Sequence, residues 1–282
     1  MERKKIAIVG TGLIGGSLAL QLNEKGLAAG IIGVDKNEEN AATALKLGLV
    51  DEIMNLEDAI DQCDLIILAT PVDQLLNLLP AVLNEINNQV VMDVGSTKFL
   101  LAKKVKAHPH RKRFVATHPM WGTEYSGPQA AVKGAFENRA VVICDANDSD
   151  AEAVSCIKSM YEKIGMHIVE MNSYDHDIHT AYISHISHIT SFALANTVLE
   201  KEKEEDAIFQ LASSGFATTV RLAKSNPHMW VPIFKQNREN VLDVLNEHIS
   251  QLRKFKSCLE KENYEYLQEL IENANRIRRI IK

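Results

Sequence analysis

The feature that most constrains the fold of this 282-residue chain is a glycine-rich segment close to its start. Four apolar residues, 6–9, are typical of a buried strand, and Gly10, Gly12 and Gly15 follow with the spacing G-x-G-x-x-G. The three glycines permit a tight turn, close approach of a pyrophosphate to the backbone, and close packing of a helix on the strand. The helical pattern that follows would direct its free N–H groups at that phosphate. We therefore expect a dinucleotide site.

A second strand pattern, 31–34, supports this interpretation because it ends in Asp35, about 20 residues after Gly15. A carboxylate at this position accepts hydrogen bonds from the adenosine ribose and repels a 2′-phosphate, which favours NAD over NADP. The alternative is a glycine-rich turn followed by a surface aspartate. The residues predicted to bind the cofactor are Gly10, Gly12, Leu13, Ile14, Gly15, Asp35, Thr70, Pro71 and Ser96.

Composition limits the partners and the setting of the chain. The net charge is −6 and the basic residues are scattered, which argues against nucleic acid or an anionic membrane as partners. The four cysteines form no C-x-x-C pair, as is typical of thiols in a reducing compartment. Residues 1–5 lead directly into the first strand, so we expect no signal peptide, and no apolar run is long enough to cross a bilayer. A cytoplasmic protein is predicted.

Strand and helix patterns alternate through the first part of the chain. The predicted strands are 6–9, 31–34, 65–69, 90–94, 114–117, 140–144 and 167–170. This alternation predicts an α/β fold with a Rossmann-type, doubly wound and mostly parallel sheet, in which the strands from 114 onward could run antiparallel. After residue 172 the pattern is helical. We expect a dinucleotide-binding domain over 1–172 and an all-α domain over 173–282.

Polar segments follow three of the predicted strands, at Thr70 and Pro71, at 93–98 and at 117–124. Ligands of parallel sheets bind at the carboxyl ends of the strands, so three parallel strands would bring these segments to the cofactor's edge. In the helical region, apolar residues recur every three or four positions from 241 to 259. This stripe is either core of the second domain or a dimer interface.

His118 is the leading candidate for an acid–base group. Pro119 disfavours helix at His118 and fixes the following turn, which places the imidazole at the end of a strand. Histidine accepts a proton readily near neutral pH. From this residue alone, a hydrogen-bonded structural histidine is an equal alternative.

The helical region contains further candidates. His185 and His188 have a spacing that can share a metal ion, but no complete ligand set accompanies them, so we expect no metal site and a polar helix face lining a pocket. Arg221 could bind a substrate carboxylate through two hydrogen bonds, or could be a surface charge. Asn226 and Pro227 are typical of a helix start. Trp230 then falls in the first turn, either exposed enough to contact a ligand or subunit, or packed in the core.

Together these segments resemble the prephenate dehydrogenase family, which also contains arogenate dehydrogenases. The resemblance runs nearly end to end and rests on residues 10–17, 93–98, 118–124, 184–188 and 213–230. The first motif is shared by dinucleotide enzymes in general, whereas the others are specific in this order. The resemblance implies NAD-dependent oxidative decarboxylation of prephenate to 4-hydroxyphenylpyruvate and CO2 in tyrosine biosynthesis. It also implies a homodimer formed through the C-terminal helices.

The resemblance gives roles to single residues. His118 would take the proton of the ring hydroxyl, and Ser96 would lie near that hydroxyl and the nicotinamide. Arg221 would hold a substrate carboxylate. The predicted substrate-binding residues are Arg221, His188, Ser184, His185, Glu124 and Trp230, the last from this subunit or its partner.

Three short segments depart from the family pattern. Trp121 stands where a small residue is usual, which could change the pocket volume or the cofactor contact. Ile186 and Ser187 replace Leu-Pro, which predicts a straighter helix with its backbone donors intact. Ala217 and Thr218 replace a basic and an acidic residue, and the missing acid leaves the orientation of the nearby arginine open.

Two alternatives to prephenate oxidation stay open at this point. Arogenate dehydrogenase activity is not excluded by any single residue. A non-catalytic NAD-binding sensor would keep the fold, but the joint presence of His118, Ser96 and Arg221 argues against it. A more distant β-hydroxyacid dehydrogenase would be expected to use a lysine base in its helical region, and we find no strong candidate.

Overall fold

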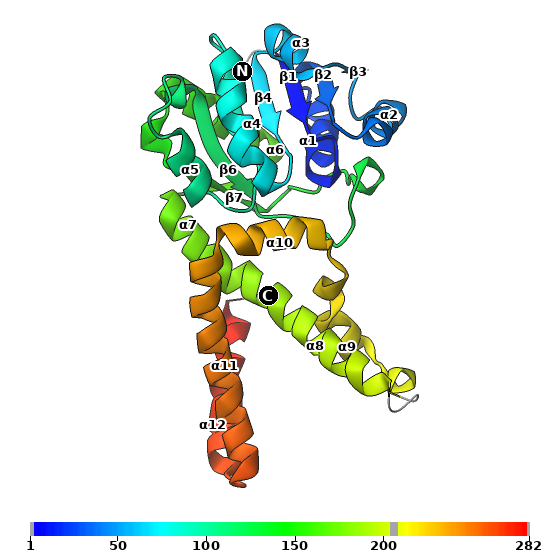
Figure 1. Cartoon of the computed structure of the whole chain (residues 1–282), viewed down its shortest axis with the longest axis vertical. Coiled ribbons are helices and arrows are strands. Elements are labelled where there is room, and N and C mark those ends of the chain that lie inside the picture. Colours follow the sequence, from blue (N-terminus) through cyan, green and yellow to red (C-terminus); the bar gives the residue numbers. More distant parts are fainter. Residues whose placement is uncertain (1–2, 204–207, 281–282) are drawn as a thin grey trace.

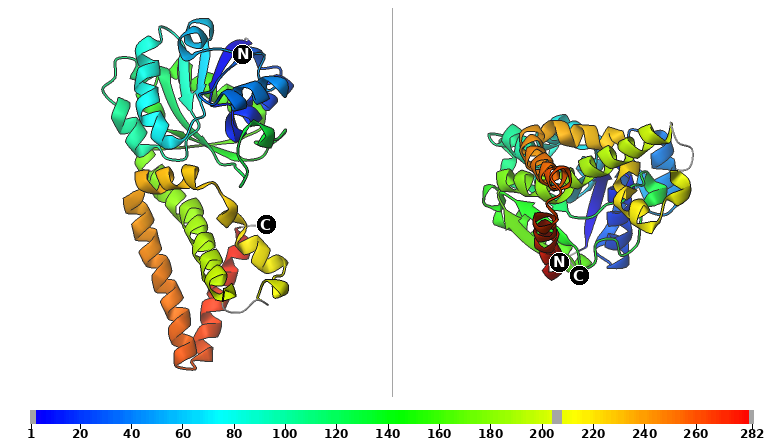
Figure 2. Two further views of the ribbon diagram at one scale, coloured as in Figure 1. Left: turned by 45° about the vertical axis from the view of Figure 1, so that its right-hand side comes forward. Right: turned by 90° about the horizontal axis from the view of Figure 1, so that it is seen from below.

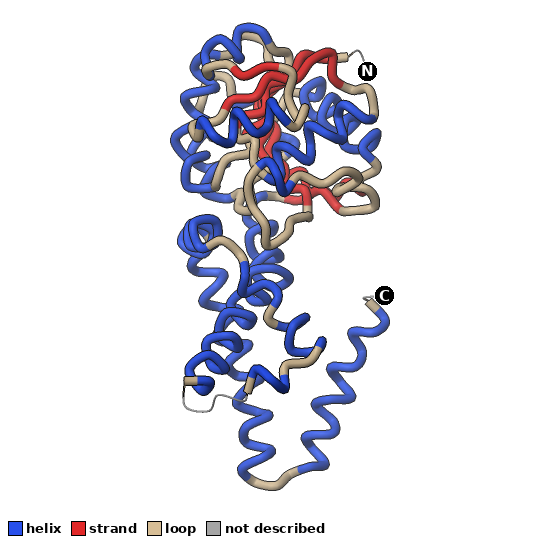
Figure 3. Tube along the Cα trace, turned by 90° about the vertical axis from the view of Figure 1, so that its right-hand side faces the viewer, coloured by secondary structure: helices blue, strands red, loops and turns tan. Residues whose placement is uncertain are grey.

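The computed structural model describes residues 3–203 and 208–280. A sheet flanked by helices forms the N-terminal region, and helices alone form the C-terminal region, which extends away from the sheet (Figure 1; Figure 3). The predicted α/β, Rossmann-type fold followed by a helical region is confirmed. Within the described ranges, no helix is both long and apolar enough to cross a membrane.

The sheet has the strand order β3-β2-β1-β4-β5-β6-β7-β8. Strands β1 to β6 are parallel, β7 is antiparallel to β6, and β8 is parallel to β7. All seven predicted strands are present, and the reversal of direction begins at β7, not at residue 114. The sequence analysis missed β3, which has two residues and therefore shows no alternation. The strands are β1 Lys4–Val9, β2 Ala28–Val34, β3 Glu52–Ile53, β4 Leu65–Leu68, β5 Val90–Asp93, β6 Phe114–Pro119, β7 Ala140–Cys144 and β8 His167–Met171.

Helices cover both faces of the sheet, because successive side chains of a strand point to opposite faces. In β4, Leu65 and Ile67 pack with α1 and α6, whereas Ile66 and Leu68 pack with α3, α4 and α5. A strand buried on both faces is uniformly apolar, as β4 is. The helices of this region are α1 Leu13–Glu24, α2 Glu38–Lys46, α3 Leu56–Gln62, α4 Val72–Glu85, α5 Phe99–Val105 and α6 Ala151–Ile164.

The helical region is joined to the sheet region by α7, and α10 lies between the sheet and the other helices (Figure 1). Helices α11 and α12 form a hairpin that extends away from the sheet (Figure 2). The helices of this region are α7 Ser173–Thr180, α8 Ile186–Glu202, α9 Ser214–Thr219, α10 Pro227–Gln236, α11 Arg238–Glu260 and α12 Tyr264–Asn275.

A π-helical turn, Ala181–His185, separates α7 from α8. The chain therefore enters Ile186 through a π-helical turn even though proline is absent. Replacing proline restores a backbone donor but does not fix the number of residues per turn. Here that turn carries the buried side chain of His185, which is held by Asn237 and packs against Trp230.

Candidate active site

The glycine-rich loop joins β1 to α1, and its three glycines meet different constraints. Gly10 has φ +98°, and a Cβ atom there would lie 2.6 Å from the carbonyl oxygen of Ala69. A Cβ on Gly15 would lie 2.0 Å from the carbonyl oxygen of Gly10. A Cβ on Gly12 would meet nothing within 4 Å. The fold itself therefore requires Gly10 and Gly15, whereas the space beside Gly12 is open.

The first turn of α1 faces this open space. Gly12 is the residue before the helix, and Leu13 and Ile14 are half-buried beside it. The amide groups of a first helical turn have no partner within the helix, and they carry the positive end of its dipole. This turn therefore supplies the donors that a bound phosphate needs.

Asp35 follows β2 and is tied to the glycine loop. Its Oδ2 accepts hydrogen bonds from the backbone N and the Oγ1 of Thr11, both at 2.9 Å, and its Oδ1 accepts one from the backbone N of Asn37 at 3.0 Å. A carboxylate held beside a phosphate-binding loop favours a ribose diol over a 2′-phosphate. These residues fit NAD.

Thr70 lies where β4 ends, next to the glycine loop. Its hydroxyl oxygen is buried and has no hydrogen-bond partner among the described residues. Buried polar groups are nearly always hydrogen-bonded, so this hydroxyl is available to a ligand at that edge of the sheet. Pro71 is exposed and precedes the first turn of α4.

His118 lies near the end of β6 and contacts the helical region. Its Nδ1 lies 2.9 Å from Nε2 of His176, and Nδ1 of His176 lies 2.8 Å from Oδ1 of Asp177. Burial, followed by the nearby His176 and Lys98, holds the pKa of His118 well below its usual range. The imidazole is therefore neutral at neutral pH and able to accept a proton.

Lys98 and Asp93 form an ion pair beneath this site, and both side chains are fully buried. Asp93 also accepts hydrogen bonds from the backbone N of Gly95, at 2.9 Å, and of Thr117, at 3.3 Å. Burial raises the pKa of Asp93, and the Lys98 ammonium opposes that shift. Through Thr117, Asp93 ties β5 to β6, and Lys98 brings a positive charge close to His118.

Ser96 lies on the loop after β5 and is half-buried, and its hydroxyl makes no hydrogen bond to another described residue. The next residue, Thr97, donates from Oγ1 to Oε1 of Gln236 at 2.7 Å. Gln236 also donates from Nε2 to the carbonyl oxygen of Val72 at 2.7 Å. The helical region therefore holds both the Ser96 loop and the first turn of α4, which follows Thr70 and Pro71.

His188 and Ser184 lie on one side of the helical region. His188 donates from Nδ1 to the carbonyl oxygen of Ser184 at 3.0 Å and stacks on Trp230, with ring centroids 3.4 Å apart. Burial lowers the pKa of His188, and the Arg221 charge adds to that shift. Its Nε2 is therefore an unprotonated acceptor at neutral pH.

Arg221 is half-exposed and forms an ion pair with Glu124, from the loop after β6, with 3.1 Å between Nη1 and Oε2. Thr218, in place of an acid, instead donates to the backbone carbonyl oxygen of Ser214. Glu124 thus supplies the partner that the missing acid would otherwise have provided for Arg221.

Two predicted substrate-binding residues are buried. Trp230 is 6% exposed, so of the two alternatives stated for it, packing in the core is the one that the structure shows. It packs against His188, Phe234 and Val72, and its indole nitrogen is buried without a partner. His185 is 1% exposed and accepts a hydrogen bond from Asn237, so it forms the wall behind Trp230.

Trp121 directs part of its bulk into the core, where its ring makes an edge contact with Phe136 at 5.3 Å between centroids. Among the described residues, no group of three or more histidine, cysteine, aspartate or glutamate side chains is arranged to hold a metal ion. The sequence analysis did not identify His176, Asp177 or Gln236 as parts of the site. The available signal was that His176 and Asp177 lie shortly before His185 and His188 in the sequence.

Comparison with known proteins agrees with this arrangement. Residues 18–170 match the model of the prephenate dehydrogenase nucleotide-binding domain, and residues 172–273 match that of the prephenate dehydrogenase dimerization domain. The chain is 34% identical to prephenate dehydrogenase of Bacillus subtilis, over 93% of this chain and 72% of that protein.

Two solved structures are similar over nearly the whole chain. One is prephenate dehydrogenase from Aquifex aeolicus in complex with hydroxyphenyl propionate and NAD+, with 29% identity, a TM-score of 0.91, and coverage of 100% of this chain and 99% of that one. The other is Synechocystis arogenate dehydrogenase, with 29% identity, a TM-score of 0.77, and coverage of 99% and 100%. This chain belongs to the prephenate dehydrogenase family.

Proposed function

We propose that this protein is an NAD-dependent dehydrogenase that converts prephenate to 4-hydroxyphenylpyruvate and CO2. The observation that carries the proposal is His118, a neutral imidazole at the edge of the sheet where the dinucleotide-binding loop also lies. A proton acceptor beside a nicotinamide site is what oxidation of an alcohol carbon requires. NAD, when bound, accepts the hydride that leaves the ring carbon bearing the hydroxyl.

His118 accepts the hydroxyl proton as the carbon–hydrogen bond breaks. The ring carboxylate then leaves as CO2, and the electron pair of the broken carbon–carbon bond enters the ring and makes it aromatic. His118 returns its proton to the phenol oxygen, so the base is restored at the end of each turnover. A general base of this kind contributes a factor of ~10²–10⁴ in rate.

Arg221 binds a substrate carboxylate, in keeping with its exposed guanidinium and planar donor geometry. In the absence of substrate it pairs with Glu124, so the substrate carboxylate competes with Glu124 for the same donors. Ser96, whose hydroxyl has no partner in the described ranges, hydrogen-bonds the ring hydroxyl, while Ser184 and His188 line the opposite side. These assignments, like those of the cofactor-binding residues, are proposals.

The first experiment is a measurement of NADH formation with prephenate and arogenate in parallel, each with NAD and with NADP. Turnover of prephenate with NAD supports the proposal, including the role of Asp35. Preference for arogenate, the substrate in the name of the Synechocystis relative, would move the substrate to the alternative while keeping His118 as the base. Binding of NAD without turnover of either substrate would leave only the sensor.

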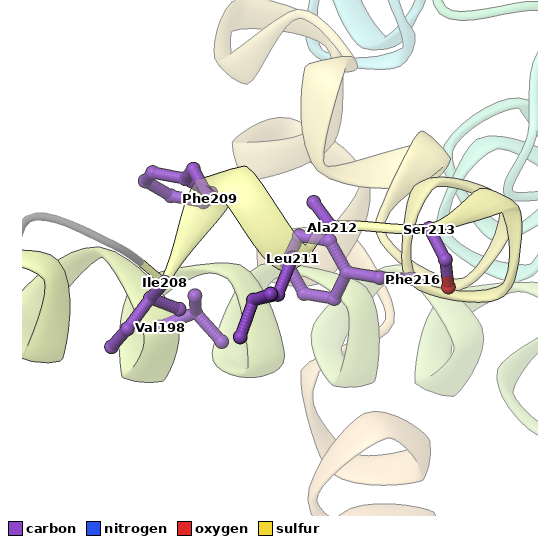
Figure 4. Close-up of a pocket in the computed structure, with 7 residues that line it drawn as sticks. All are labelled: Val198, Ile208, Phe209, Leu211, Ala212, Ser213 and Phe216. Atoms are coloured by element: carbon purple, nitrogen blue, oxygen red, sulfur yellow. The ribbon is translucent and has the colours of Figure 1, made fainter.

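We also propose that the active form is a homodimer made through the C-terminal helices. On the 241–259 stripe, Val241 is 6% exposed, whereas Leu252 and Leu259 are 54% and 60% exposed. An apolar pocket of about 220 Å³ lies between α8 and the segment before α9, where Ile208 and Leu211 lie over α8 beside Val198 (Figure 4). Exposed apolar surface of this kind is typical of subunit interfaces.

The division of the chain into a dinucleotide-binding domain, 1–172, and a substrate-binding and dimerisation domain, 173–282, is part of this proposal. It is supported by the end of β8 at Met171 and the start of α7 at Ser173. A cytoplasmic location is supported by the four cysteines, all of which have free thiols.

A further inference from the structure

His118, His176 and Asp177 form a continuous hydrogen-bonded row. The two imidazole rings meet edge to face, with centroids 5.1 Å apart and an interplanar angle of 66°. His176 is 0% exposed and Asp177 is 2% exposed, so water does not compete for these bonds. His176 and Asp177 come from α7, the first helix after the sheet, whereas His118 comes from β6.

The far end of the row fixes its direction. Asp177 accepts hydrogen bonds from the backbone N of Lys98 on Oδ1, at 2.8 Å, and from the backbone N of Phe99 on Oδ2, at 3.0 Å. Its backbone carbonyl oxygen accepts a further hydrogen bond from Nδ2 of Asn237 at 2.6 Å. An ionised carboxylate only accepts, so Nδ1 of His176 must carry the proton that it shares with Asp177.

The hydrogen on Nδ1 of His176 determines which nitrogen of His118 carries a hydrogen. A neutral His176 with its hydrogen on Nδ1 presents Nε2 as an acceptor, and the 2.9 Å contact then requires Nδ1 of His118 to donate. Nε2 of His118 is left without a hydrogen, and in the described part of the chain it has no hydrogen-bond partner. We propose that His176 and Asp177 are positioning residues that hold His118 in the tautomer whose Nε2 accepts the substrate proton.

The row has a second effect once His118 is protonated. The Asp177 carboxylate lies on the far side of His176, and a negative charge there favours protonated His118, while Lys98 and His185 disfavour it. Asp93, at the end of β5, lies behind Lys98, which precedes α5. Asp177 comes from α7 and His185 from the π-helical turn, so these are the groups that face His118 from each neighbouring element. Asp177 therefore offsets part of the cost of charging a half-buried base.

The expected effect on catalysis rests on the proposed function, whereas the expected tautomer of His118 does not. The tautomer of His118 is measured without any substrate, by ¹⁵N NMR of histidine-labelled protein at pH 7, with signals assigned by comparison with His118→Asn. We expect the unprotonated nitrogen of His118 to be Nε2. In His176→Phe, which keeps a ring of similar size but removes the acceptor, we expect the hydrogen of His118 to move to Nε2.

The kinetic experiment compares His176→Phe, His176→Gln and Asp177→Asn with wild type, using prephenate and NAD. We expect His176→Phe to lower kcat by about 10²-fold with little change in the KM for NAD. His176→Gln, whose amide can accept from His118 and donate to Asp177, should recover part of that loss. Asp177→Asn should shift the acid limb of kcat/KM to lower pH, because a negative charge that favours protonated His118 is gone.

Matched controls lie on the same helix. His179→Gln and Asp175→Asn change the same residue types at more exposed positions of α7 and should leave kcat and the His118 signals unchanged. A His176→Phe protein that folds, keeps the wild-type tautomer and retains kcat within about threefold would overturn the inference. If His176→Phe does not fold, the inference would be overturned by an Asp177→Asn variant whose kcat/KM falls off at the same acidic pH as that of wild type. Wild-type protein that lacks turnover would instead overturn the proposed function, and the NMR result would still decide the tautomer.

Discussion

The ion pair between Arg221 and Glu124 joins the helical region to the loop that follows β6, with 3.1 Å between the charged atoms. Arg221 is the more exposed partner, with 50% of its side chain accessible against 14% for Glu124. The guanidinium therefore already binds a carboxylate, through one hydrogen bond from Nη1. This pair makes Arg221 the first residue to test.

Arg221→Gln should raise the KM for prephenate by about 10²-fold with a smaller change in kcat, because one charged hydrogen-bonding group is worth roughly 1.5–3 kcal/mol. Steady-state kinetics at saturating NAD measure both constants. Lys224→Gln removes the same charge from an exposed position nearby and serves as the control. If Arg221→Gln and wild type have the same KM for prephenate, this arginine does not bind the substrate carboxylate.

His118→Asn should bind NAD with unchanged affinity and lose turnover by a factor of ~10²–10⁴, because asparagine cannot accept the proton at neutral pH. Calorimetric titration with NAD and the NADH assay measure the two properties on the same preparation. Turnover close to wild type would refute His118 as the base.

Substitutions at two glycines of the loop between β1 and α1 should distinguish an effect on stability from an effect on NAD binding. Gly15→Ala should lower the free energy of unfolding by more than about 1 kcal/mol, because the new methyl group meets the carbonyl of Gly10. Gly12→Ala should leave stability within about 0.5 kcal/mol of wild type and weaken NAD at least about tenfold. Urea unfolding and NAD titration measure these quantities. Equal NAD affinity in Gly12→Ala and wild type would contradict the phosphate-binding role.

Acidification should destabilise the fold through its buried histidines. Burial lowers the pKa values of His118, His185 and His188, that of His185 to about 4. The unfolded chain therefore binds more protons than the folded one between about pH 6.5 and pH 4, and the free energy of unfolding falls as pH falls, by up to about 1.4 kcal/mol per pH unit for each such histidine.

Urea unfolding at about pH 7 and pH 5 measures this dependence. His185→Leu should make it shallower than in wild type, because one of the titrating groups is absent. An identical slope in the variant would show that His185 does not contribute.

Leu211→Glu should weaken self-association, since Leu211 is 84% exposed beside the apolar pocket of the helical region. A charge there would have to be buried in the proposed interface. Sedimentation velocity over a range of concentrations measures the effect. Leu47→Glu, on the sheet region and 51% exposed, is the control. A dimer of unchanged affinity in Leu211→Glu would place the interface elsewhere.

Much of this arrangement could be predicted because it depends on local patterns. The uniformly apolar run of β4 and the G-x-G-x-x-G spacing determine a buried parallel strand and a phosphate loop, and both were predicted at the right positions. Asp35 and His118 were found because each lies at the carboxyl end of a strand pattern, Asp35 directly after β2 and His118 near the end of β6.

The rest depends on contacts that no local pattern records. The reversal at β7 follows from how the loop after β6 returns to the sheet, and not from the composition of the strand. The burial of Trp230 depends on α4 and α8, and the contact between His118 and His176 joins residues 58 positions apart. The partner of Arg221 could not be predicted for the same reason, because Glu124 lies 97 positions away.

The single amide of Gln236 bonds to two separate parts of the sheet region, the loop that carries Ser96 and the first residue of α4. Neither part can shift independently of α10 unless one of the two bonds breaks. The position of the Ser96 loop relative to the start of α4 is therefore set when the chain folds. We expect the substrate carboxylate to displace Glu124 from the exposed Arg221, while both hydrogen bonds of Gln236 stay intact throughout turnover.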